Sequence, residues 1–147
     1  MRVAIYTLGC KVNQYETQAM EQELLRRGHE LVPFEGEADG YIVNTCSVTA
    51  VADKKNRAVI RRCRRDHPEA VLAVCGCYPQ HDPAALAPLG IRQIDVLPFH
   101  RMGSAKWAAL GLDYAYRGVP PLSPKAAQPF AELLREQFTV TIEGDDE

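Results

Sequence analysis

Residues 2–10 read RVAIYTLGC, and this stretch decides the fold. Its first seven positions are rich in β-branched and aromatic side chains and end at Gly9, which predicts a buried strand. Cys10 follows this strand directly, in a short polar turn. Because ligands bind at the carboxyl ends of the strands in an open parallel sheet, Cys10 is a candidate ligand residue.

Strands and helices alternate along the remaining chain. Further strands are expected at residues 31–34, 41–44, 71–75, 91–97 and 138–142, and helices at 15–27, 49–66, 83–88, 101–110 and 129–137. Pro33 favours an edge strand, Asp82 is expected to cap a short helix, and Pro129 suits a first helical turn. This alternation predicts a three-layer α/β domain with a mainly parallel sheet, followed by a C-terminal strand-helix-strand appendage.

Two further cysteines share the placement of Cys10 after a strand. Cys46 lies in the string NTCSVT at residues 44–49, and Cys77 lies in GCYPQ at residues 76–80. Three thiols delivered from three strand ends can converge on one point, which is typical of a metal site. The competing interpretation is that each cysteine is simply a small buried hydrophobic residue.

The other two cysteines are assigned to the core. Cys63 lies near the apolar face of the helix expected at residues 49–66, and Cys75 lies within a strand. Cys75 is only two residues from Cys77 and points to the same side of an extended strand, so a role as a neighbouring thiol stays open.

Composition limits the classes of protein to consider. The chain has 147 residues, 46% of them hydrophobic and 24% charged, which is ordinary for one globular domain. No apolar run approaches the roughly 20 residues of a membrane span, and the start of the chain does not resemble a signal peptide. Five cysteines without an export signal predict reduced thiols and a cytoplasmic location.

Three strings in order carry a family resemblance. TLGCKVNQYET at residues 7–17, NTCSVT at 44–49 and GCY at 76–78 closely resemble the amino-terminal domain of radical-SAM tRNA methylthiotransferases. The resemblance covers residues 1 to about 90. It implies that Cys10, Cys46 and Cys77 bind an auxiliary [4Fe-4S] cluster involved in supplying the inserted sulfur. The form GCKVNQYE resembles the branch that acts on N6-threonylcarbamoyladenosine beside the tRNA anticodon.

The later part of the chain departs from that family. No three cysteines have the Cys-x3-Cys-x2-Cys spacing of the loop that binds the radical-SAM cluster and S-adenosylmethionine. Residues from about 94 to 142, beginning with DVLPFHRMG at 95–103, instead resemble the C-terminal segment of glycyl-radical (pyruvate formate-lyase) activating enzymes. His100 inherits no secure role from this resemblance.

These observations predict two parts with distinct origins. Residues 1–92 are interpreted as a methylthiotransferase N-terminal-like domain, and residues 93–147 as a radical-SAM activase C-terminal-like segment with an acidic tail. The predicted function is the iron–sulfur-cluster-binding domain of a tRNA methylthiotransferase, incomplete and inactive alone because the radical-SAM Cys-x3-Cys-x2-Cys core is missing. S-adenosylmethionine is expected only in a complete enzyme, and a separate radical-SAM partner is one way to complete it. The alternative is a non-catalytic α/β binding module with structural or zinc-binding cysteines.

A basic segment has two interpretations. Its cations could contact the phosphates of tRNA, whose backbone dominates electrostatic affinity. They could equally form the solvated face of an amphipathic helix. The seven residues are Lys54, Lys55, Arg57, Arg61, Arg62, Arg64 and Arg65.

Overall fold

The computed structural model describes residues 1–47, 49–101, 108–109, 111 and 113–144. The chain divides into two compact units, Met1–Ile91 and Arg92–Glu147. Each unit has its own parallel sheet, so the two are described separately.

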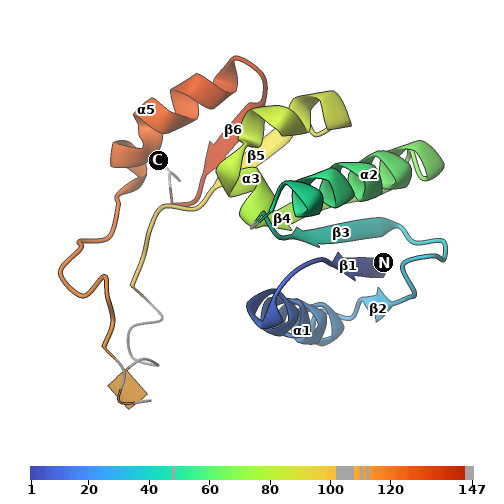
Figure 1. The fold of residues 1–147 in the computed structure, drawn as a ribbon, viewed down its shortest axis with the longest axis horizontal. Helices are drawn as coiled ribbons and strands as arrows, with labels where there is room; N and C mark the ends of the chain where they lie inside the picture. The colour runs from blue at the N-terminus through green and yellow to red at the C-terminus, as the bar shows by residue number, and fades with distance from the viewer. Residues whose placement is uncertain (48, 102–107, 110, 112, 145–147) are drawn as a thin grey trace. The chain divides into compact units, whose positions relative to one another are not determined.

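The first unit is built on a four-stranded sheet in which all neighbours are parallel (Figure 1). The strand order is β2-β1-β3-β4. Alternation of apolar and β-branched residues produces strands where the sequence predicts them, although β2 is shorter than expected and begins earlier. The strands are β1 (Arg2–Thr7), β2 (Glu30–Leu31), β3 (Gly40–Thr45) and β4 (Val71–Gly76).

Two helices cover the opposite faces of this sheet. Helix α1 (Lys11–Arg26) joins β1 to β2, and α2 (Ala50–Asp66) joins β3 to β4. These connections lead outward in opposite directions, so right-handed crossovers place the helices on opposite faces. The side chains of β3 agree, since Asn44 bonds to Thr17 of α1 whereas Tyr41 packs with Cys63 of α2. The predicted three-layer α/β architecture is therefore confirmed.

The core of this unit lies largely between the sheet and α2. Ala4, Tyr41 and Cys63 form one buried cluster, and Ile60 is fully buried on the same helix face. Thr49 caps α2 by accepting a hydrogen bond from the Ala52 amide at 3.1 Å. The assignment of Cys63 to the core is confirmed.

Two short helices follow β4. Helix α3 (Cys77–His81) was not predicted, and η1 (Pro83–Leu89) is a 3₁₀ helix at the expected place. The Asp82 carboxylate accepts a hydrogen bond from the Ala85 amide at 3.2 Å, which confirms the predicted cap.

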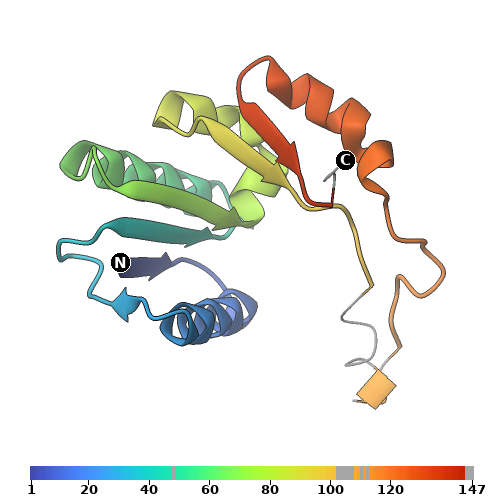
Figure 2. The ribbon, with the colours of Figure 1, turned by 180° about the vertical axis from the view of Figure 1, so that it is seen from behind.

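The second unit is a small strand-helix-strand structure, best seen from behind (Figure 2). Its elements are β5 (Gln93–Val96), α5 (Pro124–Arg135) and β6 (Thr139–Ile142), with β5 parallel to β6. Its core forms where Ala127 and Ala131 of α5 meet Ile142. This unit confirms the predicted appendage.

Two predictions for the second unit have different outcomes. Helix α5 begins at Pro124 rather than Pro129, because Ser123 provides an N-cap whose hydroxyl accepts from the Ala126 amide at 3.2 Å. The prediction that Pro129 opens this helix is therefore wrong. The helix expected at residues 101–110 lies mostly outside the described residues.

No helix in the described part of the chain has the length and hydropathy needed to cross a membrane.

Candidate metal centre at the carboxyl edge of the sheet

The three candidate cysteines all lie at the carboxyl edge of the four-stranded sheet. Cys10 is the N-cap residue of α1, Cys46 directly follows β3, and Cys77 is the first residue of α3 after β4. The neighbouring strands β1 and β3 send their connections in opposite directions, so Cys10 and Cys46 flank the topological switch point. Ligands of open α/β sheets bind in the crevice at such a point.

The loops carrying Cys10 and Cys46 approach each other closely at Gly9. This residue has a φ of +129°, and a Cβ atom built on it would lie 2.5 Å from Cys46 Cβ and 3.2 Å from Cys46 Sγ. Only glycine leaves room for the Cys46 side chain here. The Cys46 side chain therefore packs directly against the backbone beside Cys10.

A second glycine produces the same closeness beside Cys77. Gly76 has a φ of +90°, and a Cβ atom there would lie 2.2 Å from the Thr45 carbonyl oxygen and 2.6 Å from Asn44 Oδ1. The chain before Cys77 thus rests on the end of β3, immediately before Cys46. Both glycines allow strand ends to approach more closely than any side chain would permit.

The electrostatic environment separates the cysteines. The backbone N–H groups of Asn13 and Val12, in the first turn of α1, lower the pKa of the Cys10 thiol. Burial raises the pKa of Cys75 to about 11 and also raises the pKa of Cys63. Because the thiolate is the metal-binding form, this pattern favours Cys10 as a ligand and leaves Cys63 and Cys75 protonated.

The residues fit an iron–sulfur group in their chemistry and their shared edge. Cys10 and Cys77 are exposed, and Cys46 is buried. Within the described ranges, no group of three or more His, Cys, Asp or Glu side chains is placed to hold a single metal ion. In a cluster each thiolate binds its own iron, so the sulfurs stand further apart than in a single-ion site. The convergence of all three sulfurs on one cluster stays a prediction.

Sequence reasoning missed the polar side chains that hold these loops. Asn56, fully buried on α2, donates from Nδ2 to the Cys46 carbonyl oxygen at 2.8 Å. Asn13 and Thr45 bond to the other loops, as detailed below. Asn13 and Thr45 lie close to Cys10 and Cys46 in the strings that carry the family resemblance. This closeness in sequence is the signal that could have identified them as part of the site.

The basic segment divides into exposed cations and cations with internal partners. Arg64 donates to the Pro68 and Ala70 carbonyl oxygens, each at 3.2 Å, and Arg57 donates to the Tyr78 hydroxyl at 3.4 Å. Arg65 is exposed but pairs with Asp66 at 2.7 Å. The remaining exposed cations are Lys54, Lys55, Arg61 and Arg62.

Comparison with known proteins identifies the first unit. Residues 2–96 match the family model described as "Uncharacterized protein family UPF0004". The chain belongs to this family. It is 48% identical over 95 residues to a threonylcarbamoyladenosine tRNA methylthiotransferase of Bacillus subtilis, covering 65% of this chain and 21% of that protein. The predicted likeness of residues 1 to about 90 to the amino-terminal domain of tRNA methylthiotransferases is thus confirmed.

Other relatives widen the range of named substrates. The Aquifex aeolicus threonylcarbamoyladenosine tRNA methylthiotransferase is 39% identical over 97 residues, covering 66% of this chain and 23% of that protein. A ribosomal protein uS12 methylthiotransferase of Chloroflexus aurantiacus is 32% identical over 147 residues, covering 98% of this chain and 30% of that protein. The chain therefore spans less than a third of each of these relatives. No solved structure matches it. The activase-like resemblance of residues 94–142 stays a prediction.

Proposed function

We propose that residues 1–92 form the cluster-binding domain of a tRNA methylthiotransferase, in which Cys10, Cys46 and Cys77 hold an auxiliary [4Fe-4S] cluster. The observation that carries this proposal is the placement of all three cysteines at one edge of the sheet, around its switch point. When bound, the cluster would present one iron without a protein thiolate, where an exogenous sulfur can attach.

The residues around the cysteines have definite tasks in this proposal. Gly9 and Gly76 let the strand ends close around the ligands, and the first turn of α1 favours the Cys10 thiolate. Cys63 and Cys75 stay protonated and take no part in ligation. The substrate is N6-threonylcarbamoyladenosine in tRNA, because relatives of that name are 39–48% identical over the matched segment.

Residues 1–147 supply only part of the reaction. They contain no Cys-x3-Cys-x2-Cys loop, so reductive cleavage of S-adenosylmethionine requires a radical-SAM partner. Residues 93–147 are assigned to an activase-like segment, and the whole acts in the cytoplasm on tRNA. Incubated alone with S-adenosylmethionine, reductant and tRNA, the chain should yield no methylthio-adenosine, and product formation would refute this division of labour.

Anaerobic reconstitution tests the cluster directly. The wild-type chain should turn brown and contain about four irons and four sulfides, whereas zinc binding would leave it colourless. Cys10→Ala, Cys46→Ala and Cys77→Ala should each sharply lower bound iron. Cys63→Ala and Cys75→Ala are matched controls and should retain it. A colourless wild-type chain that binds one zinc would support the alternative of a non-catalytic binding module.

A further inference from the structure

The side chain of Asn13 joins the ends of β1 and β3. It is only 3% exposed and lies three residues after Cys10, in the first turn of α1. Its Nδ2 donates to the Thr45 carbonyl oxygen at 2.7 Å and to the Leu8 carbonyl oxygen at 3.3 Å. Its Oδ1 accepts a hydrogen bond from Cys10 Sγ at 3.4 Å. One buried amide therefore contacts the Cys10 loop and the residue that precedes Cys46.

The orientation of this amide is fixed by its partners. Backbone carbonyl oxygens only accept hydrogen bonds, so the amide nitrogen of Asn13 must face Leu8 and Thr45. A flipped amide would set its oxygen against both carbonyls and leave its nitrogen toward the sulfur. Asn13 thus has one satisfactory arrangement, and that arrangement also fixes its contact with Cys10.

Thr45 continues the connection from Cys46 to Cys77. The residue is fully buried, and its hydroxyl donates to the Cys75 carbonyl oxygen at 2.5 Å. The same hydroxyl accepts from the Tyr78 amide at 3.1 Å, one residue after Cys77. A hydroxyl can serve as donor and acceptor together, so this one group joins the end of β3 to both sides of Cys77.

We infer that Asn13 and Thr45 are positioning residues that link the three proposed ligand loops into one preorganised site. The links run from Cys10 through Asn13 to the Thr45 carbonyl, and from the Thr45 hydroxyl to the turn at Cys77. This inference rests on the proposed function. Metal ligands held by such outer hydrogen bonds lose less conformational freedom when the metal binds.

Variants that remove or restore a single polar group separate positioning of the ligand loops from general stabilisation of the fold. Thr45→Val removes the hydroxyl, Thr45→Ser restores it, and Asn13→Asp replaces the donor nitrogen with an oxygen. Thr17→Val is the matched control, because the Thr17 hydroxyl is also buried and bonded, to Thr7 at 2.6 Å and Asn44 at 3.3 Å. Neither partner of Thr17 is adjacent in sequence to Cys10, Cys46 or Cys77, although Asn44 also donates to the Asn13 carbonyl oxygen at 3.0 Å.

The first readout uses the chain without metal. Thr45→Val should accelerate hydrogen exchange of the Tyr78 amide roughly tenfold, because that amide loses its acceptor. Thr45→Ser should return the rate to within a few-fold of wild type, and Thr17→Val should leave it unchanged. An unchanged Tyr78 rate in Thr45→Val would overturn the link between Thr45 and the Cys77 turn.

The second readout uses the reconstituted chain, held well below the unfolding temperature of every variant. Thr45→Val and Asn13→Asp should lose iron to a chelator about tenfold faster than Thr17→Val, and their reduced clusters should give altered electron paramagnetic resonance spectra. If Asn13→Asp fails to fold, Asn13→Ser provides a side chain too short to span both loops and should show the same loss. Clusters as durable and spectrally unchanged as in wild type would overturn this inference alone. A wild-type chain that takes up no iron would overturn the proposed function together with it.

Discussion

Different interactions stabilise the carboxyl edge of the four-stranded sheet, where its strands end, and its amino edge, where they begin. At the carboxyl edge, buried amide and hydroxyl groups bond to backbone atoms, and Gly9 and Gly76 allow strand ends to touch. At the amino edge, the Tyr41 ring stacks on His67 with ring centroids 4.4 Å apart and meets the edge of Phe34 at 5.5 Å. Hydrogen bonds at the carboxyl edge fix the positions of individual atoms, whereas the amino edge is stabilised by the packing of aromatic rings.

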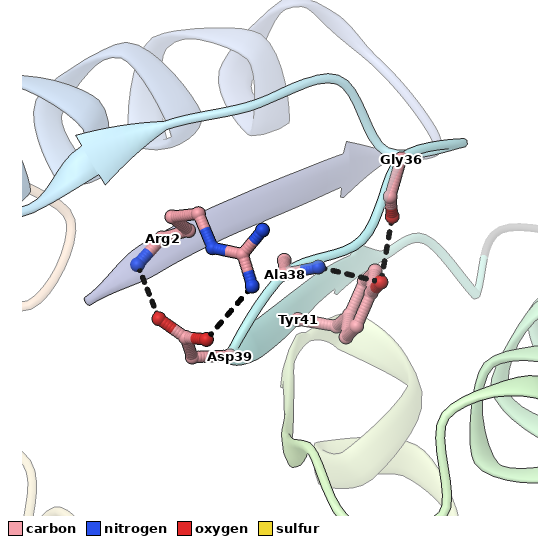
Figure 3. Close-up of polar contacts among 5 residues, drawn as sticks. All are labelled: Arg2, Gly36, Ala38, Asp39 and Tyr41. Atoms are coloured by element: carbon pink, nitrogen blue, oxygen red, sulfur yellow. Dashed lines mark hydrogen bonds and ion pairs between the residues drawn. The ribbon is translucent and has the colours of Figure 1, made fainter.

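Polar contacts at the amino edge are more exposed and tie down a loop (Figure 3). The Tyr41 hydroxyl donates to the Gly36 carbonyl oxygen at 2.7 Å and accepts from the Ala38 amide at 3.0 Å. Asp39 accepts from the Arg2 backbone amide at 2.7 Å and pairs with its guanidinium at 3.2 Å. An exposed ion pair of this kind stabilises a fold by about 1 kcal/mol at most.

The difference between the edges indicates where the sequence is constrained by geometry. Aromatic packing loses stability gradually when side chains change, because neighbouring groups can relax into part of the space. Buried side-chain-to-backbone hydrogen bonds tolerate fewer substitutes, since each lost partner leaves another polar group unsatisfied. The carboxyl edge therefore has the construction expected of a binding site.

The largest expected effect tests the crowding at the carboxyl edge. Gly76→Ala should lower the free energy of unfolding by about 3 kcal/mol, because a positive φ and a clash with the Thr45 carbonyl act together. Gly28→Ala is the matched control, since Gly28 has a φ of +80° but nothing within 4 Å of the added Cβ. It should lose only about 1 kcal/mol. Equal losses in urea denaturation would show that close approach contributes nothing.

The next effect concerns alkaline stability at Cys75, beside the carboxyl edge. Burial raises its pKa from 9.0 to about 11, so the folded state holds the thiol proton more tightly than the unfolded state. This contribution is intact below pH 9 and is lost as pH rises to 11. Since the side chain is half-buried, the loss should be about 1 to 2 kcal/mol.

Urea denaturation at pH 8, 9, 10 and 11, under reducing conditions, measures this loss. Cys75→Ala removes the titrating group and should show a shallower decline than wild type over the same interval. Identical declines would mean that the Cys75 thiol ionises as easily in the folded state as in the unfolded state. That result would reopen its assignment to the core.

The sequence predicted the elements whose signals are local. β1, β3, β4 and α2 were expected close to their observed positions because apolar periodicity and the Thr49 cap mark them. The start of α1 at Lys11 was missed because Cys10 is not one of the usual N-cap residues. The start of α5 was misplaced because Pro129 outweighed the Ser123-Pro124 pair, which carries a cap and an N1 proline together.

The candidate site was only partly predictable for a related reason. Cysteines after strands can be recognised one at a time, and the switch point follows from the order of elements. The bonds from Asn13 to Thr45 and from Thr45 to Tyr78 join residues 32 and 33 positions apart. Their partners become evident only once the register between β1, β3 and β4 is known.

A smaller effect is expected at the amino edge. Tyr41→Phe keeps the ring packing but removes the hydroxyl bonded to Gly36 and Ala38, so the free energy of unfolding should fall by about 1 kcal/mol. Iron and sulfide content after reconstitution should equal that of wild type, because the three proposed ligands, Cys10, Cys46 and Cys77, lie at the carboxyl edge. Loss of the cluster in this variant would show that the two edges are energetically coupled.

The smallest effect on stability is expected from the exposed cations of α2, which runs from one edge to the other. Lys54 and Lys55 lie toward the carboxyl edge, and Arg61 and Arg62 toward the amino edge. The pairs are about 10 Å apart along the helix, slightly more than the ~8 Å screening length at physiological salt, so their effects are separable. Replacing either pair with Gln should change the free energy of unfolding by less than about 0.5 kcal/mol.

Binding of an anticodon stem-loop distinguishes the pairs. If the RNA approaches the cluster edge, as the proposed function requires, the change at Lys54 and Lys55 should weaken binding more than the change at Arg61 and Arg62. It should also flatten the slope of log affinity against log salt by roughly 0.7 to 0.9 for each lost phosphate contact. Arg64→Gln is no substitute in this comparison, since its guanidinium bonds to the Pro68 and Ala70 carbonyls and its loss perturbs the fold. Equal, negligible effects of both pairs would identify these cations as a solvated helix face and place the tRNA contact elsewhere.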